Sequence, residues 1–113
     1  MESILTSIKK LLGIKEDYSH FDVDIIMHIN TVLSMNLRQI GVGPSTGFAI
    51  QGASETWDDF LGSGEDYEAV KTYVYLKVRL LFDPPTASNV LEAIKSQIAE
   101  YEWRLNVQAE SEV

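Results

Sequence analysis

The chain has 113 residues, the length of a single compact domain, and 45% of them are hydrophobic, as a globular core requires. It contains no cysteine, which excludes disulfide bonds and thiolate chemistry and fits folding in a reducing cytoplasm. Its formal net charge of −8, from 17 acidic and 9 basic side chains, gives it no general attraction for phosphate backbones, so we expect no sequence-specific binding to nucleic acid.

The first predicted element is an amphipathic helix close to the N-terminus. Gly13 stands where its C-terminal cap belongs. No apolar run in the chain approaches the ~18 residues of a membrane-spanning helix, and no cleavage site follows this segment. We therefore expect neither a signal peptide nor contact with a membrane. The apolar face of this helix consists of Ile4, Leu5, Ile8, Leu11 and Leu12.

A second helix is expected to begin between Ser19 and Asp24, because Ser19 and Asp22 have the spacing of a capping box. Gly41 is expected to end it. Its apolar stripe, which should face the core, consists of Ile25, Ile26, Ile29, Val32, Leu33, Leu37 and Ile40.

Residues 41–64 differ in character and contain six of the chain's seven glycines, together with Pro44 and several serines and threonines. Such a segment cannot sustain a long element, so we expect a flexible insertion with a functional role. Within it, residues 47–50 fit a short extended piece. Residues 56–61 fit one capped helical turn.

Residues 65–82 fit both a strand and a helix by their apolar pattern. Length favours the helix, because strands average about 5–6 residues and this segment has no internal turn signal. It is apolar on more than one side, so it should lie centrally in a bundle. Asp83, Pro84 and Pro85 end it, since the residue before a proline avoids helical angles.

The last helix is expected over residues 86–106, and residues 107–113 form an acidic C-terminal tail that we expect to fray. The fold class is therefore mainly α, a small four-helix bundle-like domain over residues 1–106 with one long glycine-rich insertion. The helix carries a heptad seam suited either to one antiparallel neighbour or to another subunit: Ala87, Leu91, Ile94, Ile98, Tyr101 and Leu105.

A search for chemistry finds no catalytic, cofactor or metal site. His20 and His28 lie near acids, but their spacing matches no metal-binding motif. The acids between residues 58 and 66 lack the spacing of a calcium loop. Residues 41–44 lack the lysine of a phosphate loop, and no serine stands in a nucleophile motif. We expect that the protein is not an enzyme.

Aromatic residues and one arginine are the candidates for an interface with another subunit or another protein. They are Trp57 and Phe60 in the insertion, and Tyr101, Trp103 and Arg104 near the end of the last helix. Each of them either packs on the chain's own core or serves as an interface hot spot, for which Trp, Tyr and Arg are the favoured types. Both interpretations are open at this point.

The run KTYVYLKVRLLFDPP at residues 71–85 is distinctive, and further segments accompany it at Ile40–Gly43, Glu55–Gly62, Leu91–Ile94, Gln97–Glu100 and Glu102–Asn106. Together they resemble the small head–tail connector (adaptor) proteins of long-tailed bacteriophages. The resemblance covers roughly residues 4–106; its middle is specific, whereas the first helix is generic.

The resemblance implies a structural subunit of the virion that forms a ring with copies of itself, usually twelvefold, below the portal protein of the DNA-filled head. The ring continues the DNA channel and offers a platform to the next neck or tail-completion protein. Each subunit of a ring needs two different contact surfaces. We expect the heptad seam with Trp103 to supply one and the insertion with Trp57 the other.

The acidic charge has a possible place in such a ring. Asp58, Asp59, Glu65 and Asp66 are candidates for the channel wall, where like charge would let DNA slide without sticking. Two other functions stay open from the sequence: another small neck or tail-completion protein, and a helical adaptor or regulatory protein that binds a host partner.

Overall fold

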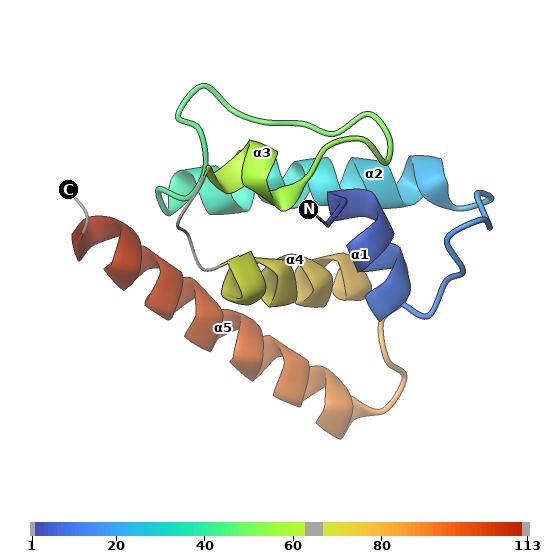
Figure 1. Cartoon of the computed structure of the whole chain (residues 1–113). Coiled ribbons are helices and arrows are strands. Elements are labelled where there is room, and N and C mark those ends of the chain that lie inside the picture. Colours follow the sequence, from blue (N-terminus) through green and yellow to red (C-terminus); the bar gives the residue numbers. More distant parts are fainter. Residues whose placement is uncertain (1, 63–66, 112–113) are drawn as a thin grey trace.

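The computed structural model describes residues 2–62 and 67–111, and these residues form helices joined by loops, with no strand among them (Figure 1). The elements are α1 (Ile4–Leu11), α2 (Asp22–Thr31), η1 (Val32–Leu37), α3 (Trp57–Leu61), α4 (Tyr67–Phe82) and α5 (Ser88–Ser111). The predicted mainly α, bundle-like fold class is confirmed. Because η1 continues α2, the four predicted long helices are α1, α2 with η1, α4 and α5.

Helix α1 begins and ends with the local signals that its sequence carries. The Ser3 hydroxyl accepts a hydrogen bond from the Thr6 N–H at 3.2 Å, and Gly13 follows the helix with φ of +83°. The predicted face is buried at Ile4, Leu5 and Ile8, whereas Leu11 is exposed. The first helix therefore forms as predicted and rests its N-terminal half on the core.

Helix α2 begins at Asp22 without the predicted capping box, because no side chain caps its first turn. The Asp22 carboxylate instead forms an ion pair with Lys9 at 2.8 Å. Lys9 is buried, and its ammonium group also donates to the backbone carbonyls of Glu16 and Tyr18 at 3.0 and 2.8 Å. One lysine on α1 thus holds the loop before α2 and the first residue of α2.

The second long helix changes from α to π geometry over η1, a feature that its sequence pattern did not predict. Its buried residues Ile25, Ile29, Leu33 and Leu37 repeat every four residues, and an α-helix repeats every 3.6. In a π turn each N–H bonds five residues back. The wider turn therefore keeps Leu37 on the same side of the helix as Ile29.

Two hydroxyl groups accompany the change to π geometry. Thr31 donates its side-chain hydroxyl to the Met27 carbonyl at 3.0 Å, and Ser34 donates to the Asn30 carbonyl at 2.6 Å. Such bonds compete with the backbone ladder four residues apart. The helix ends as predicted at Gly41, whose φ is +90°.

The insertion passes over α2 and is attached to it through Asn30 (Figure 1). The Asn30 amide nitrogen donates to the Ile50 carbonyl at 3.0 Å, and its oxygen accepts from the Ile50 N–H at 2.7 Å. Ile50 itself is buried. Residues 47–50 form no strand, and residues 63 and 64 lie outside the described part. Whether the insertion is flexible stays a prediction.

Helix α3 is the predicted capped turn. Thr56 and Asp59 form a complete capping box, in which each side chain accepts a hydrogen bond from the other's N–H. Just before it, the Glu55 carboxylate accepts from the N–H groups of Gln51 and Gly52, and these backbone bonds lower the pKa of Glu55. Backbone pairing of Ser3 with Thr56 then joins α3 to the start of α1.

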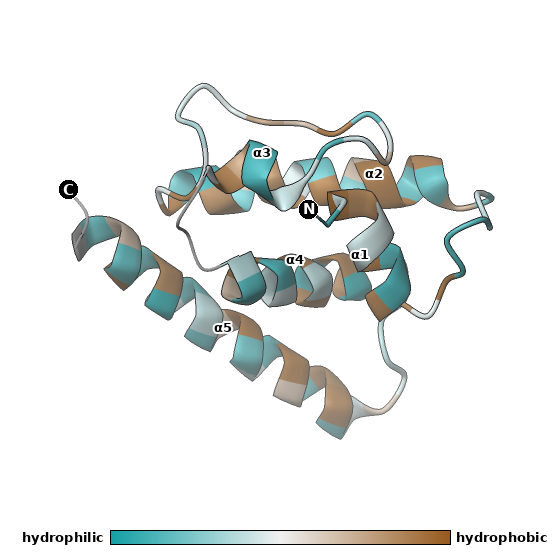
Figure 2. Cartoon of the chain, viewed as in Figure 1, coloured by the Kyte–Doolittle hydropathy of each residue, from teal (hydrophilic) through white to brown (hydrophobic). Residues whose placement is uncertain are grey.

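Helix α4 is central, as its pattern predicted, and contacts α1, α2, α3, η1 and α5. Val70, Tyr73, Val74, Leu76 and Val78 are buried along it, and it ends at Phe82 ahead of the two prolines. Brown and teal residues are mixed along both α4 and α5 (Figure 2).

Helix α5 packs its seam on α4, with Ile94, Ile98 and Leu105 buried in the contact. The Tyr73 hydroxyl donates to the Glu102 carboxylate at 2.7 Å and adds a polar link between the two helices. The helix continues to Ser111 and so runs past the predicted end at residue 106, while fraying of the tail stays a prediction. The remaining two residues of the tail lie outside the described part.

Candidate assembly surfaces

The outer side of α2 and η1 carries a row of exposed residues that we call the α2 row: Val23, Met27, Thr31 and Met35. Val23 is 80% exposed, Met27 57% and Met35 65%. The row lies half a helical turn from the buried residues Ile25 and Ile29. Three large apolar side chains on one line are thus left in solvent by the chain's own fold.

The outer side of α5 carries a second such row, the α5 row, which consists of Ala99, Trp103 and Val107. Trp103 is 67% exposed and Val107 43%. The row faces away from the seam that packs on α4. Beside it, the Arg104 guanidinium forms an exposed ion pair with Glu100 at 2.8 Å.

The two rows lie on different sides of the molecule. Helix α4 contacts both α2 and α5 and lies between them (Figure 1). Each row lies on the side of its helix opposite the buried residues. Adjoining exposed apolar side chains mark interaction sites more often than singly scattered ones do. The chain therefore offers two separate apolar surfaces, one on each outer helix.

Two of the predicted interface residues are buried in the subunit's own core. Trp57 is 1% exposed, and its indole N–H donates to the Ser7 hydroxyl at 2.9 Å. Phe60 is 3% exposed and packs edge-on against Phe48, with ring centroids 5.2 Å apart. For these two the structure shows packing on the chain's own core, which was one of the two open interpretations. Their burial needs no neighbouring subunit.

The other three predicted interface residues lie in the C-terminal half of α5. Tyr101 is half-buried and packs against the core. Trp103 and Arg104 are exposed. The expectation that the seam and Trp57 supply the two contact surfaces is therefore corrected: the seam is used up on α4, and Trp57 lies within the core. Trp103 stays available on the opposite side of the helix.

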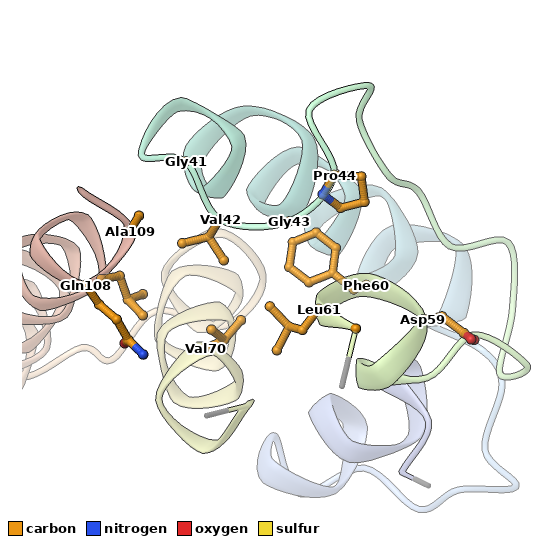
Figure 3. Close-up of a pocket in the computed structure, with 12 residues that line it drawn as sticks. Gly41, Val42, Gly43, Pro44, Asp59, Phe60, Leu61, Val70, Gln108 and Ala109 are labelled. Carbon is orange, nitrogen blue, oxygen red and sulfur yellow. The ribbon is translucent and has the colours of Figure 1, made fainter. Parts of the chain in front are cut away.

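A cavity of about 420 Å³ lies where the end of α5 meets the insertion (Figure 3). Gly41–Pro44 and Asp59–Gly62 form much of its wall, so two of the segments that carry the resemblance come together here. Among the described residues that line it, Asp59 is the one ionisable residue, and Figure 3 shows its carboxylate pointing away from the cavity. This described part of the lining therefore holds no pair of acid and base.

The predicted channel acids are only partly described. Asp58 is half-exposed, Asp59 is exposed and engaged in the α3 capping box, and Glu65 and Asp66 lie outside the described residues. His20 packs edge-on against Phe21 with ring centroids 4.9 Å apart. In the described part of the chain no three His, Asp or Glu side chains are grouped so that they could hold a metal ion.

Among the described helices none is long and apolar enough to cross a membrane. The family of phage connector proteins matches the chain over residues 4–112. No curated protein and no solved structure matches it.

Proposed function

The chain belongs to the family of phage connector proteins, and from that premise we propose that it is a ring subunit of the phage neck. The ring lies below the portal of the DNA-filled head, joins the head to the tail and continues the DNA channel. Its partners are copies of itself, the portal protein and the next neck or tail-completion protein.

The observation that carries the proposal is the pair of apolar rows on different sides of the subunit. A ring is closed by heterologous contacts, in which one surface of each subunit meets a different surface of the next. Trp103 on one side and the two methionines of the α2 row on the other supply two such surfaces. A protein that acts alone gains nothing from leaving both in solvent.

We also propose that the acidic segment around α3 lines the channel, where its charge repels the phosphates of passing DNA. Asp58 is the suitable residue to test, because Asp59 is needed for the α3 cap. Asp58→Asn phages should eject DNA more slowly than wild-type phages in a fluorescence assay of released DNA. Unchanged ejection kinetics would remove Asp58 from the channel wall.

The experiment that tests the proposed function is electron microscopy of a lysate from phages that lack this gene. We expect filled or leaking heads beside separate, complete tails. Supplying the gene from a plasmid should restore joined particles and controls for effects on neighbouring genes. Normal infectious particles without the gene would refute the proposal.

A further inference from the structure

We propose that neighbouring subunits join through the α2 row of one copy and the α5 row of the next, packed as parallel helices with Trp103 seated over Thr31. The inference rests on the proposed function, because it takes a second copy of this chain as the occupant of both rows. It adds which surfaces meet, in which direction and in which register.

The parallel direction follows from the fold of the single subunit. Figure 1 shows that α2 and α5 run in the same sense, both opposite to α4. Neighbours in a ring of many subunits are related by a small rotation, which leaves helix directions almost unchanged. Two helices that run in the same general sense within a subunit therefore meet in the same sense between subunits. A two-fold dimer would instead bring each row against itself.

The register follows from the sizes of the side chains. Thr31 is the smallest residue of the α2 row and lies between Met27 and Met35, both of which are exposed. Its hydroxyl is already bonded to the Met27 carbonyl, so it can be covered without losing a hydrogen bond to water. Trp103 is the largest residue of the α5 row. Methionine side chains adapt their shape readily and can close around an indole ring.

Charged residues beside the two rows favour the same arrangement. With Trp103 over Thr31, the parallel packing sets Asp24 close to the level of Lys95, and Arg38 level with Glu110. The antiparallel packing would set Asp24 level with Glu110 and Arg38 beside Lys95. All four side chains are exposed, and none forms an ion pair within the described part of the chain. Opposite charges therefore favour the parallel packing and like charges oppose the other.

The absence of cysteine in the natural chain allows a clean cross-linking test of this register. The parallel packing sets Met27 level with Ala99 and Met35 level with Val107. Phages carrying M27C/A99C or M35C/V107C, once purified and oxidised, should yield a ladder of disulfide-linked oligomers, because each chain carries both halves of the contact. The matched controls M27C/V107C and M35C/A99C pair only in the antiparallel register and should yield none. A ladder from the control variants would overturn the proposal. The absence of a ladder from both M27C/A99C and M35C/V107C, in otherwise complete particles, would also overturn it.

A second variant tests the anchor of the contact. Adding Trp103→Ala to the M35C/V107C chain should lower the yield of linked oligomers about tenfold or more, as loss of a central tryptophan does in other interfaces. Circular dichroism should show the same thermal unfolding as the parent chain, since Trp103 is exposed. Leu81→Ala, which changes an apolar residue that is 52% exposed and lies outside both rows, is the control and should leave the yield unchanged.

Failure of the proposed interface can be distinguished from failure of the proposed connector function. Unchanged linked oligomers and normal joining of heads to tails with Trp103→Ala would exclude this interface and leave the connector function standing. Normal particles from phages that lack the gene would exclude the connector function itself.

Discussion

Replacing Gly43 with alanine tests whether the glycine-rich segment after η1 is held by the ring of Phe60. Gly43 has φ of +88°, and a Cβ built on it would overlap that ring, which is itself buried and packs on Phe48. Gly13 has a nearly identical φ of +83°, but a Cβ there would meet nothing within 4 Å. The two positions therefore differ in packing and share the same backbone cost.

The expected loss of stability can be worked from these two terms. A residue other than glycine in left-handed backbone costs about 1–2 kcal/mol, and forcing extra atoms into a packed region costs typically about 1–3 kcal/mol more. Gly13→Ala should thus lower the free energy of unfolding by about 1–2 kcal/mol. Gly43→Ala should lower it by about 2–5 kcal/mol, a large part of the stability of a domain this size.

Urea denaturation followed by circular dichroism measures both values. With m of about 1–3 kcal/mol per molar urea, the packing term alone should separate the two midpoints by about 1 M. Adding Phe60→Leu to each glycine variant should recover stability only in the Gly43→Ala background, because a smaller side chain makes room for the new methyl group. Equal losses for the two glycine variants would refute the packing argument.

Two further predictions concern polar links within the subunit. Lys9→Met should lower the free energy of unfolding by about 3 kcal/mol in the same assay, because two carbonyls and Asp22 lose their buried partner. The control Lys10→Met changes an exposed lysine and should alter the free energy of unfolding by less than about 0.5 kcal/mol. Similarly small effects from both variants would mean that Lys9 does not hold the loop. Burial and the neighbouring Glu102 carboxylate raise the pKa of Tyr73 above its ordinary value of 10.0. Because the unfolded chain then loses this proton first, stability should be full below about pH 10 and fall as the pH rises further. Tyr73→Phe should cost about 1 kcal/mol at neutral pH and make the alkaline loss shallower in urea titrations at several pH values, and an equally steep loss would contradict the assignment.

Local signals were sufficient to predict where most helices begin and end. The threonine and aspartate of the α3 capping box, the glycines that follow α1 and η1, and the prolines after α4 act on the backbone within a few residues of themselves. The spacing of apolar residues likewise predicted which side of each long helix would be buried. Such features depend on neighbours in sequence, so no knowledge of the rest of the fold was needed.

Pairings between distant segments could not be predicted in the same way. The sequence placed Asp22 in a capping box with Ser19, but the folded chain offers it the ammonium group of Lys9 on another helix. The π turn of η1 follows from the need to keep four buried residues on one side of a long helix. Both outcomes depend on which segments lie against one another.

The candidate assembly surfaces were likewise predicted from the sequence only in part. The sequence by itself determined a helical chain of the connector family with two tryptophans among its candidate interface residues. Periodicity, caps and the distinctive run at residues 71–85 depend only on the order of residues. Only the tertiary structure decided that Trp57 fills the core beside Ser7 while Trp103 stays in solvent. The reason is physical: a side chain is buried or exposed according to the segments that pack over it, and those segments are distant in sequence.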